Sequence, residues 1–448
     1  MTYCVPMRRL LAAVMLIAQL WPITATASDC SWDQAPGWVA RENQKAGDKK
    51  WSDGVPLRFS ADFSRRKDVP RMEGYVSASS ATCGDSLTLR TVGSKKFTAS
   101  IYRMGYYNNS GARLVKVLKS PTQISIDAKT PPGQYLIKLS NNLRAATLIP
   151  FMVYGDAPSD ATFVSSVLTW QSYNQWGGAS LYKGADGARE TAATVVTFDR
   201  PYDGDGSGQF RYMEQPLLSL MEKVGLDINY VTDFEVDRNP KVFETTKTII
   251  IGGHSEYWTV AMRDSIDAAV AAGVNLVAFG GNSAYAITEI ENREIRGRTA
   301  YRDVLRPESL LLGSQYFALG IKKDLISNNV WPFKTLGKDA VIKGLYGYEA
   351  DTAMGTIGPG VQVVARAAIS PTEKGFVAMS TYYNAPSGAS VMNMGTNAWV
   401  CAMKNRCPWA HTFDPVAQKQ ITQVTTEVLK AVKTSKWPVA QIDIPSRP

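Results

Sequence analysis

The chain has 448 residues, which is more than one ordinary domain needs and favours two. An apolar content of 45% with 10% aromatic residues is typical of a globular protein with a large core. The formal charge of +9 is dispersed along the chain rather than gathered in a stripe, so the composition argues against nucleic-acid binding.

The first 27 residues have the pattern of a secretory signal peptide. Arg8 and Arg9 form a charged start, Leu10–Leu20 is an apolar run, and Ala25-Thr26-Ala27 is a cleavage site of the A-x-A type. We therefore expect an exported protein, periplasmic or secreted. The apolar run is too short to span a membrane, and no later stretch of that kind appears, although an uncut N-terminal anchor is the alternative.

Cleavage before Ser28 leaves four cysteines, and an even number in an exported chain predicts two disulfides. Four cysteines allow three pairings. The spacing CAMKNRC favours a local bond between Cys401 and Cys407, which leaves Cys30 for Cys83. A four-cysteine metal site is the alternative, but no C-x-x-C spacing supports it.

The segments that follow divide by their periodicity. Residues 28–71 predict an extended leader segment, because they are rich in aromatic and basic residues and show no long period. Residues 72–156 predict a β-sandwich, because short alternating runs such as SLTLRTV, FTASIYRMG and GQYLIKLS are separated by Gly, Pro, Ser and Asn.

Residues 157–440 alternate strands with helices, which predicts a parallel, doubly wound α/β domain. Phe210–Val224 is an amphipathic helix ended by Gly225, and Pro415–Lys433 is the terminal helix. The fold class expected is therefore α+β with two domains. The sequence leaves a homo-oligomer and a small partner subunit open.

One strand–turn–helix stands out in that second part. Thr248–Ile251 is a β-branched run that suits a strand buried on both faces, and helical spacing begins at Thr259. His254 and Glu256 lie in the turn between them, at the carboxyl end of the strand, where ligands bind in open α/β sheets. One of the chain's two histidines is therefore at this turn.

Two kinds of chemistry fit this turn. A serine hydrolase would use Ser255, but Tyr257 breaks the G-x-S-x-G pattern, and the base would have to be the adjacent His254 or His411. A metal site would use Glu256. Asn282 would lie near Glu256, since it closes the next buried strand.

A series of motifs in the chain is shared with a known family. They read IYRMGYYNNSGARLV, PPGQYLIKLS, TWQSYNQWGGASLY, FDRPY, EQPLLSLMEKVGLDINYVTDFEVD, GGHSEYWTVAMRDSIDAAVAAGVNLVAFGGNSAY and RTAYRD. In this order they resemble the C-terminal region of the large subunit of N,N-dimethylformamidase and its relatives, from about Tyr102 to Arg302. The resemblance implies an amidotransferase-like α/β domain after the sandwich, and hydrolysis of an amide C–N bond in a small-molecule substrate.

The resemblance also implies a mononuclear iron (Fe³⁺). Its ligands would be Tyr135, from the P-x-G-x-Y segment, Tyr173, from W-Q-x-Y-N, and Glu256, from H-x-E. Phenolate and carboxylate are hard oxygen ligands that suit a ferric ion. Such a site would lie between the two domains, since Tyr135 is in the sandwich.

The catalytic residues implied by the resemblance are His254, as a proton carrier, and Asn282, as a hydrogen-bond donor to the oxyanion. A family lysine falls at Arg302 here, and arginine cannot deprotonate, so any base role is lost.

Two other functions compete with this one. The first is a non-enzymatic envelope or polysaccharide-binding protein in which Trp170, Trp176 and Trp258 form a stacking platform. The second is a metal-free hydrolase that uses Glu256 and His254.

Overall fold

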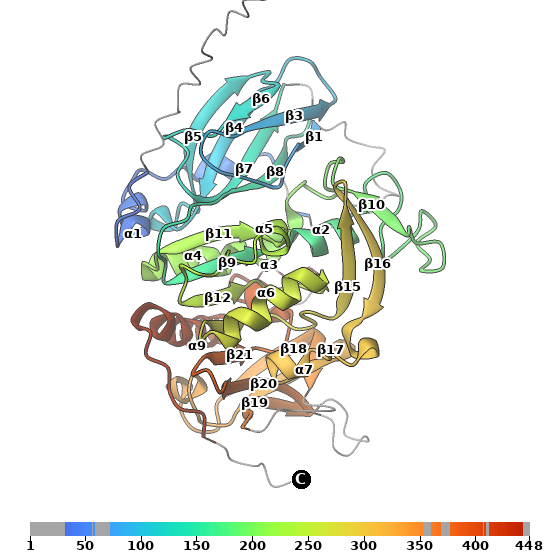
Figure 1. Cartoon of the computed structure of the whole chain (residues 1–448). Helices are drawn as coiled ribbons and strands as arrows, with labels where there is room; N and C mark the ends of the chain where they lie inside the picture. Colours follow the sequence, from blue (N-terminus) through green and yellow to red (C-terminus); the bar gives the residue numbers. More distant parts are fainter. Residues whose placement is uncertain are drawn as a thin grey trace, which may run out of the picture.

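The computed structural model describes residues 32–55, 57–58, 72–142, 144–352, 360–368, 377–405, 407–408 and 412–441. The predicted signal peptide, Cys30 and His411 lie outside these ranges. The described chain is a mixed α and β protein with large sheets and few helices (Figure 1). No helix in the described part is long and apolar enough to cross a membrane.

Two sheets face each other in the N-terminal part, drawn in blue and cyan in Figure 1. Alternating side chains fill the space between them, among them Leu87, Leu89, Ile101 and Ile137. The first sheet has three strands, in the order β1 (Glu73–Val76), β3 (Ser86–Val92) and β6 (Gln123–Ser125). The second sheet has five strands, in the order β2 (Ser80–Ala81), β8 (Thr147–Val153), β7 (Gly133–Ser140), β4 (Thr98–Met104) and β5 (Ala112–Lys119). The expected leader segment contains a short helix, α1 (Trp38–Glu42), and a 3₁₀ turn, so it is not extended throughout.

A nine-stranded sheet forms the larger part of the molecule. Five parallel strands stand side by side in the order β11 (Ile228–Thr232), β9 (Ala161–Ser165), β12 (Thr248–Ile251), β14 (Asn275–Ala278) and β21 (Ser390–Asn393). Four antiparallel strands continue it, in the order β20 (Val377–Asn384), β19 (Gln362–Ala368), β17 (Gln315–Ser327) and β18 (Val341–Thr352).

The parallel strands are buried on both faces, as their β-branched sequences predict. Ile249 and Ile251 pack into the cluster that includes Ile266 of α6 (Val260–Ala271), whereas Ile250 packs into the cluster of Ile421 of α9 (Pro415–Thr434). The remaining helices are α2 (Val167–Tyr173), α3 (Gly208–Met213), α4 (Gln215–Val224), α5 (Asp233–Arg238), α7 (Ser309–Leu312) and α8 (Ala398–Ala402). A four-stranded sheet stands beside them, in the order β10 (Val195–Thr197), β16 (Glu294–Ala300), β15 (Ala286–Glu291) and β13 (Tyr257–Trp258).

The prediction of one continuous helix over residues 210–224 is wrong, because the structure divides this segment into α3 and α4. Glu214 separates them with φ −130° and ψ −40°, outside the helical region. Its buried carboxyl group accepts hydrogen bonds from the amide of Ser166 (2.9 Å) and the hydroxyl of Ser165 (2.7 Å) at the end of β9. The predicted end at Gly225 is confirmed, since this glycine has a positive φ of 78°.

The predicted disulfide between Cys401 and Cys407 is confirmed, with 4.8 Å between their Cα atoms. Cys83 is also disulfide-bonded. The partner expected for it, Cys30, is outside the described residues.

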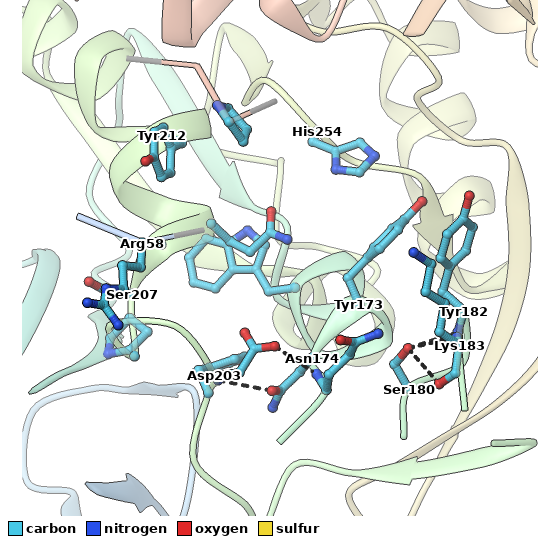
Figure 2. Close-up of a pocket in the computed structure, with 18 of the residues that line it drawn as sticks. Arg58, Tyr173, Asn174, Ser180, Tyr182, Lys183, Asp203, Ser207, Tyr212 and His254 are labelled. Atoms are coloured by element: carbon cyan, nitrogen blue, oxygen red, sulfur yellow. Dashed lines mark hydrogen bonds between the residues drawn. The ribbon is translucent and has the colours of Figure 1, made fainter. Parts of the chain in front are cut away.

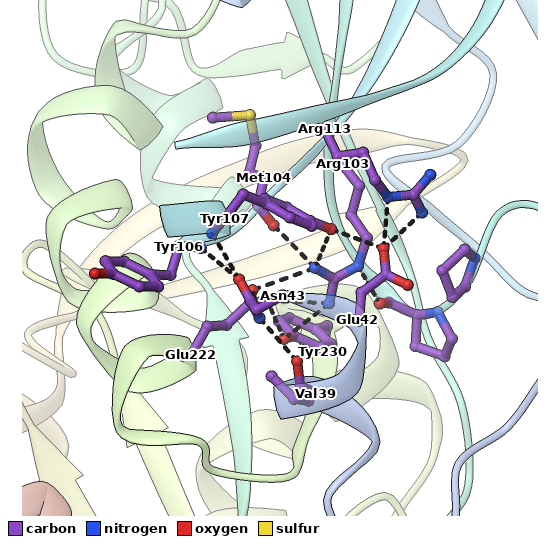
Figure 3. Close-up of polar contacts among 12 residues, drawn as sticks. Val39, Glu42, Asn43, Arg103, Met104, Tyr106, Tyr107, Arg113, Glu222 and Tyr230 are labelled. Atoms are coloured by element: carbon purple, nitrogen blue, oxygen red, sulfur yellow. Dashed lines mark hydrogen bonds and ion pairs between the residues drawn. The ribbon is translucent and has the colours of Figure 1, made fainter. Parts of the chain in front are cut away.

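A buried ionic network joins the two parts of the chain (Figure 3). Arg103 of β4 forms an ion pair with Glu222 of α4 at 3.0 Å, and both side chains are fully buried. Tyr230 of β11 donates to Glu222 at 2.6 Å, and Tyr107 donates to Glu42 of α1 at 2.9 Å. Every charge in this network has a partner, which is the condition for burying it.

Candidate functional site

The site lies where three neighbouring parallel strands end. Tyr173 is the last residue of α2, which follows β9; His254 and Glu256 follow β12; and Asn282 follows β14. The strand order β9, β12, β14 brings these ends to one edge of the sheet, as predicted.

The two glycines after β12 let the turn pack closely against the break between α3 and α4. A Cβ atom on Gly252 would meet Cγ of Glu214 at 2.7 Å, and one on Gly253 would meet the Met213 carbonyl oxygen at 2.8 Å. Close approach, rather than a positive φ, is therefore the reason for glycine at both positions.

Glu256 is the centre of the site. The hydroxyl of Tyr173 donates a short hydrogen bond to Glu256 Oε2. His254 Nε2 lies 3.7 Å from the same oxygen, and an Nη of Arg298 lies 3.5 Å from Oε1. The side chains of His254 and Glu256 are 3% and 1% exposed, so these charges are almost completely removed from water.

A second carboxylate, Glu349 of β18, completes the arrangement. Its Oε2 lies 3.3 Å from His254 Nε2 and accepts hydrogen bonds from the side-chain amides of Asn282 (3.2 Å) and Asn397 (3.0 Å). β18 reaches the site because the sheet curls, so that Ala350 pairs with Thr396 just beyond β21. Asn282 thus acts on Glu349 in this structure, and its backbone adopts the left-handed region with φ 55°.

Burial and charge set the protonation of the site. Burial raises the pKa of Glu256 to about 7, and the nearby Glu349 adds to this, whereas His254, Tyr173 and Arg298 act in the opposite direction. Burial alone would lower the pKa of His254, but the two carboxylates outweigh it, and that pKa is raised. Burial and then Glu256 raise the pKa of Tyr173 well above 10, so its hydroxyl stays protonated and donates.

Two predicted site residues lie elsewhere. Tyr135 is fully buried in the core between the N-terminal sheets, where its ring stacks on Phe151 and its hydroxyl donates to the Pro131 carbonyl oxygen at 2.6 Å. Arg302 forms an ion pair with Glu308 and donates to the Tyr316 carbonyl oxygen at 3.0 Å.

The residues that the sequence did not predict are Glu349, Asn397 and Arg298. Arg298 is on β16, and no motif around it signals contact with Glu256.

The stacking platform suggested for a polysaccharide-binding protein is absent, since Trp170 and Trp258 are 2% and 0% exposed. Ser255 is not poised as a nucleophile, because its hydroxyl accepts a hydrogen bond from the Trp258 indole at 2.9 Å.

A cavity of about 530 Å³ opens onto the site (Figure 2). Tyr173, His254 and Glu349 line one part of it. Arg58, Ser207 and Tyr212 line another part, well separated from Lys183 in the view of Figure 2. Pro150 of β8, in the N-terminal part of the chain, also contributes to the lining.

Comparison with known proteins places the chain in a family. Residues 98–409 match the family described as N,N-dimethylformamidase beta subunit-like, C-terminal. The chain belongs to this family. No curated protein matches the chain. The match contains every residue of the site, and membership of the dimethylformamidase-like family suggests a hydrolase.

The iron expected for a dimethylformamidase-like site can be tested against the donors present. No three His, Cys, Asp or Glu side chains within the described ranges form a metal-binding group, so a metal here depends on tyrosine oxygen. Tyr173 and Glu256 provide two adjacent oxygen donors of the hard type that Fe³⁺ prefers. A cation between them would also offset the repulsion between Glu256 and Glu349. Two of the three expected ligands therefore fit, and Tyr135 does not.

Proposed function

We propose that this protein is an exported hydrolase that cleaves an amide C–N bond, with iron held by Tyr173 and Glu256. The observation that carries the proposal is the hydrogen bond from Tyr173 to Glu256, next to His254. Tyr173 and His254 line the cavity. The family supports the same reaction class.

Several residues around Glu256 each have a separate role in hydrolysis. Iron, when bound, supplies Lewis acidity to the substrate carbonyl. His254 carries a proton from the attacking water to the departing nitrogen. Glu349 orients His254, and the side-chain amides of Asn282 and Asn397 hold Glu349 in place. Water adds to the acyl carbon, the C–N bond breaks, and an amine and a carboxylic acid result.

The proposal includes two finer points of architecture and location. The larger part of the chain would be an amidotransferase-like domain, with the site at its interface with the sandwich; the Pro150 lining supports this. Export follows from the N-terminal pattern, and protein recovered from outside the cytoplasm should begin at Ser28.

A metal-free hydrolase is the second candidate. It is favoured by one observation: the pKa of Glu256 is raised to about 7 next to His254, which suits acid–base catalysis near neutral pH. Here Glu256 would transfer the proton and Tyr173 would orient it.

Metal removal distinguishes these two candidates. The purified protein is assayed for amine release from a panel of small amides, before and after chelation, with metal content determined by elemental analysis. Our proposal predicts bound iron, loss of activity on chelation and recovery on adding iron. Activity that survives complete metal removal but is lost in His254→Asn would replace it with the metal-free mechanism. No amine release from any amide would reject both.

A further inference from the structure

The cavity beside Glu256 is far larger than the smallest amides require. A small amide such as dimethylformamide has about five non-hydrogen atoms and occupies on the order of 100 Å³, given about 30 Å³ for one water molecule in the liquid. The cavity offers about 530 Å³, within the range of sites for larger ligands. A small amide alone would leave most of this space filled with water.

The lining of the cavity is unusual in its chemistry. Among the described residues that form it, there is no Leu, Ile, Val, Met, Ala or Phe side chain. Six aromatic rings line it beside hydrogen-bonding side chains, together with glycines, two prolines and Cys407. The aromatic residues are Trp170, Tyr173, Tyr182, Tyr202, Tyr212 and Tyr348. Ligand sites are usually lined by apolar side chains, so this wall selects a ligand that is polar throughout.

Two details indicate that this wall is built for a ligand. Tyr348 adopts φ 61°, a left-handed conformation that is rare for a bulky side chain and is concentrated at functional sites. It directly precedes Glu349, so the same strand segment supplies the cavity wall and the carboxylate behind His254. Gln209 also lines the cavity, and its Oε1 is buried with no hydrogen-bond partner among the described residues.

A carboxylate-bearing amide fits this cavity less well. Arg58 and Lys183, which are the Arg and Lys side chains among the described residues of the lining, are exposed, and Figure 2 places them on opposite sides of the pocket. They therefore do not converge on one anionic group. A sugar instead offers C–H faces to tyrosine rings and hydroxyl groups to the polar side chains between them.

We infer that the substrate is an N-acylated amino sugar, with its amide at Tyr173 and His254, next to Glu256, and its sugar ring against the other tyrosines of the cavity. The inference rests on the amide hydrolysis proposed above and names the substrate class for the same site. Water adds to the acyl carbon, the C–N bond breaks, and a free amino sugar and a carboxylic acid leave. A sugar amide of about 15 non-hydrogen atoms would fill a much larger part of the cavity than a five-atom amide.

Calorimetric titration tests the substrate class with three probes of known chemistry. They are N,N′-diacetylchitobiose, a sugar amide; cellobiose, which has the rings without the amide; and N-acetylglycine, an amide with a carboxylate. We expect N,N′-diacetylchitobiose to bind to the wild-type protein at least tenfold more tightly than the other two. Absence of binding, or tighter binding of N-acetylglycine, overturns the inference.

A variant of the cavity wall supplies the structural control. Tyr212→Leu should weaken binding of N,N′-diacetylchitobiose about fivefold to tenfold, since an aromatic face is lost. Tyr75→Leu, a half-buried tyrosine on β1, should leave binding unchanged. Equal losses in both variants would overturn the inference.

Failure of the inference differs from failure of the proposed function. Amine release from small amides without binding of the sugar amide rejects only the inference. Binding of N,N′-diacetylchitobiose without release of acetate supports the sugar site and rejects hydrolysis.

Discussion

Glu222→Gln should destabilise the protein strongly, because it removes a charge from the buried network of Figure 3. Each carboxylate oxygen of Glu222 has two polar partners. Oε1 accepts a hydrogen bond from Tyr230 (2.6 Å) and forms an ion pair with Arg103 (3.0 Å), and Oε2 accepts hydrogen bonds from Arg103 (3.2 Å) and Asn43 (2.8 Å). Glutamine has nearly the same shape but turns an NH₂ group toward two of these donors.

The size of the loss in the free energy of unfolding follows from the Arg103 charge that the substitution leaves unpaired. Arg103 keeps its full charge at 0% exposure, and a charged hydrogen bond is worth about 1.5–3 kcal/mol. Loss of two such bonds agrees with the cost of about 3–5 kcal/mol for breaking a buried ion pair from one side. We therefore expect the free energy of unfolding to fall by about 3–5 kcal/mol.

Guanidinium-induced unfolding, followed by circular dichroism and tryptophan fluorescence, measures this change. The matched control is Glu427→Gln, which breaks an ion pair of α9 whose Lys430 is 61% exposed, and should cost about 0.5 kcal/mol or less. A loss below about 1 kcal/mol for Glu222→Gln, or one equal to the control, would refute the argument that this network is fully desolvated.

Three further predictions concern other parts of the molecule. Burial raises the pKa of Glu214 from 4.5 to about 8 in the folded state, so folding favours its protonated form, and the free energy of unfolding falls as pH rises from about 4.5 to about 8. Glu214→Gln should flatten this slope, by at most about 1.4 kcal/mol per pH unit, in denaturation curves taken across that range. Replacing Cys401 and Cys407 together by serine should cost about 2 kcal/mol in the same assay, and a cost near zero would contradict a stabilising loop. Arg298→Met should lower kcat/KM for amide hydrolysis about tenfold, whereas Arg302→Lys should change it less than about twofold; equal losses would contradict the contacts of these two side chains.

Local signals in the sequence predicted local structure well. Thr248–Ile251 is a strand buried on both faces, and the helix after it begins at Val260 with Thr259 as its N-cap. All of the information for these elements lies in consecutive residues, and tertiary contacts agree with it. The turn that carries His254 and Glu256 was predictable for the same reason.

Long-range geometry was not predictable in this way. Glu349 approaches His254 because an antiparallel extension of the sheet curls back over the parallel strands, and no short motif encodes that curl. The break at Glu214 likewise depends on a partner, the end of β9, that is distant in sequence.

Tyr135 is a residue for which the periodicity of its strand argues against the predicted role as a metal ligand. Residues of one parity on a strand share a face, and Tyr135 has the parity of Ile137 and Leu139, which fill the core between the N-terminal sheets. A side chain on that face cannot also point toward Glu256. The alternation of β7 therefore contained the evidence against a ligand role.

The visible spectrum of the purified protein tests the central claim most directly, because iron bound by a tyrosinate absorbs through ligand-to-metal charge transfer. Our account predicts a coloured protein with about one iron per chain. Tyr173→Phe should lose the band, and Tyr135→Phe should keep it, since Tyr135 lies in the core between the N-terminal sheets. A colourless wild-type protein without iron, or loss of the band in Tyr135→Phe alone, would contradict the site that we assign to Tyr173 and Glu256.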